Sequence, residues 1–174
     1  KWAKTGNATT ASTTLPTKFN EDVEIDLLFY REHIVMHLVC RCTRWHMGKE
    51  IDNKTTQALL DGIVDIWIAL HGPMEHLHLD GESGLNNEEA MAFFKRRGIQ
   101  VHVRAPGQHA RFIERHGAIT RAGLHIMEAQ LLKEGITIVF KIILGEQFYA
   151  ENAMMTYGQG TPYQAVYGRQ PYML

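Results

Sequence analysis

The sequence predicts an α/β domain in which a mixed sheet is covered by helices on both faces. Apolar runs with a two-residue period alternate along the chain with longer runs that have three- and four-residue periods. Their order is three strands, a helix, a strand, a helix, a strand and two helices. At 174 residues, 45% of them hydrophobic and 21% charged, the chain is long enough for one sizeable core.

The first three strands are predicted over residues 23–51. In residues 23–30, VEIDLLFY, alternation places Val23 and Ile25 on one face and Asp26 on the other. Residues 33–46 predict one long strand or two consecutive strands, paired with the first as an antiparallel hairpin, and residues 47–51 predict the third strand. Cys40 and Cys42 would share a strand face, which is a poor arrangement for a disulfide and favours a reducing compartment.

The remaining elements are indicated by helix caps and by chain breakers. Thr55 or Thr56 and Asn87 are suitable N-caps, and Gly72, Pro73 and Gly135 end helical runs. In chain order we expect a helix over 55–72, a strand over 76–80, a helix over 88–97, a strand over 99–103, and helices on either side of Gly135.

Three acidic residues stand out from this pattern. Asp26 interrupts an apolar strand, Asp80 closes the strand HLHLD, and Glu114 lies in the first turns of an amphipathic helix. Asp80 follows Asp26 by 54 residues, and Glu114 follows Asp80 by 34. Because the chain has 19 acidic residues, this spacing alone is weak evidence for a site.

The three acids suit a site for hard divalent cations. Magnesium and manganese prefer oxygen ligands, and two such ions about 3.5–4 Å apart stabilise the attacking and leaving oxygens of a phosphoryl transfer. Buried like charges raise one another's pKa unless cations neutralise them. One acid shared between two ions, flanked by two others, would suffice.

Composition restricts the function classes. The formal net charge is −1 and the pI about 6.9, so any contact with nucleic acid must come from a local basic patch. No apolar stretch approaches the roughly twenty residues that cross a bilayer, which predicts a soluble protein without membrane partners. The polar opening run predicts an extended linker over residues 1–20, with the folded domain over 21–174.

The end of the chain carries the most specific string. Asn152 and the segment TYGQGTPYQAVYGRQP, residues 156–171, resemble the conserved end of long-terminal-repeat retrotransposon integrase cores. The IERHG segment around Glu114 is similar to the Glu-Arg segment of that family, and Pro106, Gly107 and Gln108 match the loop before it. The resemblance to the retroviral and retrotransposon integrase catalytic core covers about residues 23–171.

The resemblance implies a ribonuclease H-like fold with a five-stranded mixed sheet flanked by helices on both faces. It implies 3′-end processing and DNA strand transfer, with Asp26, Asp80 and Glu114 as the catalytic and metal-binding residues and two Mg²⁺ or Mn²⁺ ions per active site. Element and target DNA would be the partners of a homodimer or higher homo-oligomer, nuclear after a cytoplasmic stage. Glu82, close to Asp80, is a further acid near the site.

Five residues near Glu114 are candidates for DNA contacts: Gln108, Arg111, Arg115, His116 and Arg121. Basic side chains on a helix bind phosphates, although an ordinary solvated helix face has the same composition.

Three alternatives remain open on the sequence alone. A ribonuclease H-type or repair nuclease would share the fold, and a domesticated, inactive core would bind only DNA or protein. A third interpretation concerns the ten histidines: His76, His78 and Asp80 would share a strand face within reach of one zinc ion. Zinc usually takes four ligands, so packing or solvated histidines are the default.

Overall fold

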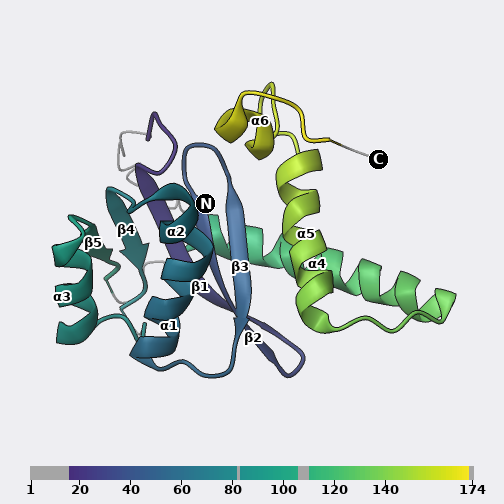
Figure 1. Ribbon diagram of the computed structural model, residues 1–174, viewed down its shortest axis with the longest axis horizontal. Coiled ribbons are helices and arrows are strands. Elements are labelled where there is room, and N and C mark those ends of the chain that lie inside the picture. Colours follow the sequence, from purple (N-terminus) through teal and green to yellow (C-terminus); the bar gives the residue numbers. More distant parts are fainter. Residues whose placement is uncertain (1–15, 82, 106–109, 173–174) are drawn as a thin grey trace, which may run out of the picture.

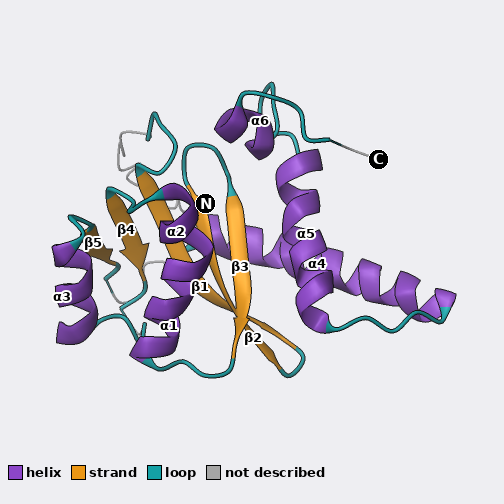
Figure 2. Cartoon of the chain, in the orientation of Figure 1, coloured by secondary structure: helices purple, strands orange, loops and turns teal. Residues whose placement is uncertain are grey.

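The computed structural model describes residues 16–81, 83–105 and 110–172, and its centre is a five-stranded mixed sheet (Figures 1 and 2). The strands are β1 (Asp22–Tyr30), β2 (His33–Cys40), β3 (His46–Ile51), β4 (His76–Leu79) and β5 (Gln100–Val103). They lie in the order β3-β2-β1-β4-β5. The first three form an antiparallel meander, and β4 and β5 run parallel to β1. The predicted mixed sheet is confirmed.

One face of the sheet is covered by the first helices of the chain. These are α1 (Thr56–Ile63), the π-helical turn η1 (Val64–Ile68), the short α2 (Ala69–His71) and α3 (Glu88–Arg96). Ile25, Leu38 and Leu77 of the sheet pack there in one core with Ile63 and Phe94. Thr55 and Asn87 accept hydrogen bonds from Ala58 N and Ala90 N, as expected of N-caps.

The opposite face is covered by α4 (Arg111–Glu134) and α5 (Phe140–Met154), and Figure 1 shows α4 behind the sheet and α1 in front of it. A second apolar core joins Leu28 and Val35 of the sheet to Leu124, Leu144 and Phe148 of these helices. Because both faces are covered, β1 buries Val23 and Ile25 on one face and Leu28 and Tyr30 on the other. The even-numbered residues of β1, including Asp26, face α4.

Several boundaries differ from the sequence-based expectation. The predicted strand over 33–46 is β2 alone, and Cys42 lies in the turn before β3; both cysteines are free. The helix over 55–72 contains η1, a local π-turn that holds the buried Trp67. A further helix, α6 (Pro162–Tyr167), lies in the tail. Its N-cap Thr161 and Gln164 form a capping box.

Part of the predicted linker contacts the domain. Asn20 donates hydrogen bonds to the carbonyl oxygens of His71 and Pro73 and accepts one from the Trp67 indole at 2.8 Å. Phe19 lies edge-on to His71, with ring centroids 5.1 Å apart. Among the described residues, no helix has the length and apolar character that a membrane crossing requires.

Candidate active site

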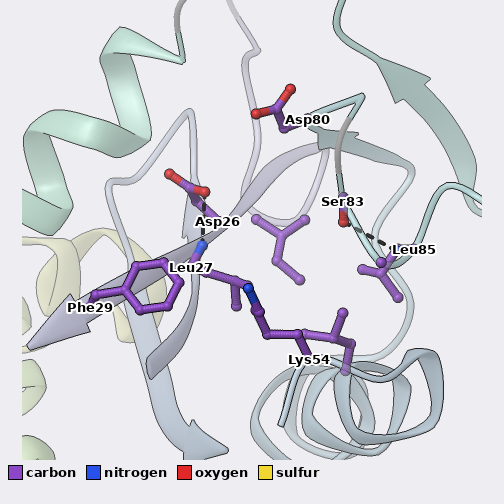
Figure 3. Close-up of a pocket in the computed structure, with 10 residues that line it drawn as sticks. Asp26, Leu27, Phe29, Lys54, Asp80, Ser83 and Leu85 are labelled. Atoms are coloured by element: carbon purple, nitrogen blue, oxygen red, sulfur yellow. Dashed lines mark hydrogen bonds between the residues drawn. The ribbon is translucent and has the colours of Figure 1, made fainter. Parts of the chain in front are cut away.

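Asp26 and Asp80 lie side by side on neighbouring parallel strands. The register of β1 and β4 pairs Asp22 with His76 and Glu24 with His78, so its continuation places Asp80 opposite Asp26. Asp80 follows the last residue of β4, at the carboxyl end of the strand. Parallel strands present their carboxyl ends at one edge of the sheet, where sites are often built. Figure 3 shows both carboxylates projecting to the same side.

Glu114 joins the two aspartates from the first turn of α4. Burial raises the pKa of Asp26, and the negative charges of Asp80 and Glu114 raise it further. A backbone hydrogen bond from Leu27 N at 2.8 Å and the positive charge of Arg104 act in the opposite direction. The fold therefore gathers the three predicted acids within electrostatic reach of one another.

The described residues provide no positively charged side chain that pairs with these three acids. Across residues 16–81, 83–105 and 110–172, no lysine or arginine forms an ion pair with Asp26, Asp80 or Glu114. Arg104, whose charge reaches Asp26, is instead paired with the buried Glu24. Three oxygen-donor side chains with excess negative charge fit a hard divalent cation.

A cavity of about 400 Å³ lies beside the two aspartates. It forms because β4 ends at Leu79, which leaves the edge of β1 beyond Asp26 without a strand neighbour. Apolar side chains of β1 and α1 form part of its wall, and Lys54 and Ser83 contribute polar groups (Figure 3). Gly84 packs on the Lys54 loop, since a Cβ there would lie 2.8 Å from the Lys54 carbonyl oxygen.

Two residues of this cavity are not singled out by any sequence pattern. Phe29 is 53% exposed although it belongs to an apolar strand, and the Lys54 ammonium lies 5.6 Å from the centre of its ring. An exposed aromatic ring with a neighbouring cation is typical of nucleic-acid contacts. The signal in the sequence is weak, because the exposure of Phe29 depends on where β4 stops.

The candidate DNA-contact residues divide into two groups. Arg111, Arg115 and Arg121 are exposed on α4. Arg111 and Arg115 line a second cavity of about 300 Å³ together with Arg44, whose guanidinium lies 4.4 Å from the Phe112 ring centre. These arginines form none of the ion pairs found among the described residues. Gln108 lies outside the described residues, as does Glu82.

His116 does not belong to that exposed surface, which corrects the expectation from the sequence. It is only 4% exposed and lies on the buried face of α4, beside His46. Burial lowers the pKa of His116 to about 4, and His46 contributes to the shift. A neutral, buried imidazole does not bind phosphate as Arg111 and Arg115 can. Arg115 is exposed and His116 is buried, although both line the cavity of about 300 Å³.

The zinc site considered at His76, His78 and Asp80 is not formed by the described residues. His76 Nδ1 lies 2.9 Å from His102 Nε2, whereas His78 Nε2 bonds Asp22 Oδ1 at 2.5 Å. Among the described residues, one group of three has ligand atoms close enough for a single metal ion, and it is elsewhere: His46, His116 and Glu151.

Comparison with known proteins supports the fold. No protein-family model matches the chain, and no curated protein matches it. Among solved structures, a chain of the simian T-cell lymphotropic virus intasome, in complex with PP2A regulatory subunit B56 gamma, superposes with a TM-score of 0.77 at 14% identity. The match covers 91% of this chain and 60% of that one, so the chain spans less than two thirds of its length.

Two isolated cores match over nearly their whole length. The HTLV-2 integrase catalytic core domain, in complex with magnesium, gives a TM-score of 0.71 at 14% identity, over 85% of this chain and 97% of that one. The catalytic core domain of BIV integrase gives 0.70 at 16% identity, over 83% and 92%. The chain therefore has the ribonuclease H-like fold of retroviral integrase catalytic cores, as the sequence resemblance implied.

Proposed function

We propose that this domain is a divalent-metal-dependent polynucleotidyl transferase of the integrase type, which processes 3′ ends of element DNA and joins them to target DNA. The observation that carries the proposal is the convergence of Asp26, Asp80 and Glu114, without cationic partners among the described residues, beside an open cavity. The likeness to integrase cores supports the same assignment through the fold.

Asp26 is the central residue of the proposed site. The charges of both other acids act on it, so it would be shared by two Mg²⁺ or Mn²⁺ ions, one held with Asp80 and the other with Glu114. When bound, such ions favour deprotonation of an attacking hydroxyl and stabilise charge on the leaving oxygen. The chain's own part is to hold the carboxylates rigidly: Asp26 within the sheet, Asp80 at a strand end and Glu114 on a long helix.

DNA would lie across the edge where the acids meet. Lys54 and Phe29 on one side, and Arg111 and Arg115 on the other, offer charge for phosphates and a ring for stacking. Arg121, further along α4, extends the basic surface. Because contacts to phosphates carry little base information, target preference should be slight. Because the net charge is only −1, contact with DNA needs a local group of basic side chains, and these residues would provide it.

A homo-oligomer fits the apolar surface of the helical face. Ile126 and Leu132 of α4 are 71% and 82% exposed, and Ile142 of α5 is 53% exposed. Figure 1 shows the C-terminal part of α4 extending beyond the sheet. Exposed apolar side chains that gather on one surface are typical of an interface. Because the target of the proposed reaction is chromosomal DNA, the protein would act in the nucleus after a cytoplasmic stage.

The test is a manganese-dependent disintegration assay, in which the domain reverses strand transfer on a branched DNA. Wild type should resolve the branch, and Asp26→Asn, Asp80→Asn and Glu114→Gln should each abolish this activity without loss of the folded structure. Activity that survives all three substitutions would exclude the proposal. Cleavage of RNA in an RNA–DNA hybrid without DNA joining would instead indicate a ribonuclease H-type nuclease, and a folded protein that binds no Mn²⁺ would indicate an inactive core.

A further inference from the structure

A second group of metal-ligating side chains lies on the α4 side of the sheet, apart from the three acids. It consists of His46 at the start of β3, His116 on α4 and Glu151 on α5. One ligand atom from each lies within 4.8 Å of the others. The three residues are 1%, 4% and 4% exposed. Elements far apart in the chain thus bring two imidazoles and one carboxylate together in the interior.

The carboxylate of this group is held on both oxygens. Glu151 Oε2 accepts a hydrogen bond from His46 Nδ1 at 2.7 Å. Its Oε1 accepts from Thr120 Oγ1 at 2.7 Å and from Gln147 Nε2 at 2.8 Å. The other nitrogen of His46, Nε2, lies 2.9 Å from His37 Nδ1. Metal ligands are typically oriented in this way by a second layer of hydrogen bonds.

His116 completes the group. Its ring packs edge-on against His46, with centroids 5.4 Å apart, and among the described residues neither of its nitrogens forms a hydrogen bond. His116 also lines the cavity of about 300 Å³, so a ring nitrogen is free to bind a ligand together with His46 and Glu151.

We propose that His46, His116 and Glu151 bind one zinc-type divalent cation, at a site distinct from the carboxylates of the proposed active site. Two imidazoles and one carboxylate are a ligand set that zinc takes in proteins, with water in the fourth position. Imidazole ligands favour Zn²⁺, Ni²⁺ or Cu²⁺ over the hard Mg²⁺ and Mn²⁺ that suit an all-oxygen site. The ion joins the sheet to α4 and α5, two residues along α4 from Glu114.

Binding requires the ring proton of His46 to change position. In the metal-free arrangement His46 donates its single ring proton from Nδ1 to Glu151, so coordination through Nδ1 needs the other tautomer, with that proton on Nε2. His46 Nε2 then donates to His37 Nδ1 across the contact already present, and His37 carries its own single proton on Nε2, so no proton is released to solvent. No side chain outside the cluster has to move for this exchange.

The route to the site has a definite consequence. His116 forms part of the 300 Å³ cavity that Arg44, Arg111 and Arg115 also line. Positive charge at this entrance opposes a cation, while Glu151 beyond it attracts one. We therefore expect the ion to load during folding and to exchange slowly with chelators in the folded protein.

The experiment measures metal content after expression with added zinc and gel filtration. Wild type should contain about one zinc per chain, and His116→Ala and Glu151→Gln should each lose it. Glu151→Gln keeps the size of the side chain and leaves hydrogen-bond capacity for Thr120. The matched control is His102→Ala, which removes a histidine from the exposed His76–His102 pair and should retain the zinc. Asp26→Asn should also retain it, which separates this site from the proposed active site.

A second measurement covers the case in which a variant does not fold. Wild type expressed with cobalt instead of zinc should show visible absorption bands of a site with nitrogen and oxygen ligands only. Wild type without bound zinc and without a cobalt spectrum would overturn the proposal. Equal zinc content in wild type, His116→Ala and Glu151→Gln would overturn it as well, because the ion would then lie elsewhere.

Discussion

The acidic side chains on the α4 side of the sheet fall into two groups, one with partners supplied by the fold and one without a lysine or arginine partner. Glu24 and Glu151 are almost fully buried, yet each is paired: Glu24 with Arg41 and Arg104, and Glu151 with His46, Thr120 and Gln147. Asp26, Asp80 and Glu114 are less buried, and the described residues give them no lysine or arginine partner. Burial alone would have selected acids that lie outside the proposed active site.

The difference teaches how to separate an acid that the fold compensates from an acid that is available for catalysis. A buried carboxylate is tolerated only when the fold supplies its hydrogen bonds and charges. Acids that are gathered together and left uncompensated retain their affinity for an external cation. Substitutions in the two kinds of acid should therefore have separable effects, of which the loss of catalysis is the greatest.

The largest contrast concerns catalysis by two acids of the same helix. Glu114→Gln should lower manganese-dependent DNA joining by more than about 100-fold, because it removes a ligand that stabilises charge in the transition state. Glu134→Gln, at the exposed far end of α4, should leave the rate within about twofold. Initial rates on one branched DNA substrate measure both. Equal losses in the two variants would contradict the assignment of Glu114.

The paired acid should matter for stability instead. Glu24→Gln leaves the guanidinium groups of Arg41 and Arg104 without their carboxylate and should destabilise the domain by about 3 kcal/mol. The exposed Lys49–Asp65 pair is the control, and Asp65→Asn should cost less than about 1 kcal/mol. Urea unfolding monitored by circular dichroism measures both free energies. A Glu24 variant as stable as the control would contradict the structural role of the paired acid.

Removing the charge of Asp26, which has no lysine or arginine partner among the described residues, should stabilise the domain, whereas Glu24→Gln destabilises it. Because the pKa of Asp26 is raised in the folded protein, the folded state binds that proton more tightly than the unfolded state does. Its contribution to stability is therefore greatest at low pH and falls as pH rises above the ordinary value of 3.8.

Asp26→Asn removes this pH-dependent loss. Without divalent cations, the variant should be more stable than wild type at pH 7, and the advantage should disappear as pH approaches 3.8. Saturating Mg²⁺ should then stabilise wild type, because it binds only the folded state, and should have less effect on Asp26→Asn. Thermal unfolding across pH, with and without Mg²⁺, measures this. A wild type that Mg²⁺ does not stabilise would contradict the prediction.

The smallest effect lies outside both groups of acids. Thr161→Ala removes the side chain that caps α6 and should weaken that helix by about 1 kcal/mol. Amide exchange at Gln164 and Ala165 should accelerate about fivefold, while exchange in β1 stays unchanged. Thr137→Ala, in the exposed segment between α4 and α5, is the matched control and should alter neither.

Local patterns in the sequence predict much of this architecture. Alternation along β1 places Asp26 on the other face of the sheet from Val23 and Ile25. The glycine after Asp80 marks a strand end, and Asn87 is the N-cap that its position indicates. These signals succeed because each depends on a few neighbouring residues. The helix α6 is a local feature that the sequence-based prediction lacks, because a segment this short carries no helical periodicity.

Features that depend on contacts distant in the chain cannot be predicted in this way. The Glu24–Arg104 pair joins residues 80 apart, and the His46–Glu151 contact joins residues 105 apart. The basic neighbours of His116 in the sequence predict that its side chain is exposed. Its burial depends instead on which face of α4 packs against the sheet. The exposure of Phe29 follows from the early end of β4, which no residue near Phe29 indicates.

The most direct measurement is anomalous X-ray scattering from crystals of this domain grown with Mn²⁺. We expect manganese density enclosed by the carboxylates of Asp26, Asp80 and Glu114, and its absence in crystals of Asp26→Asn grown in the same way. Well-ordered wild-type crystals that show no manganese there at saturating Mn²⁺, or that show it only at other acids, would contradict the claim that these three residues form a metal site.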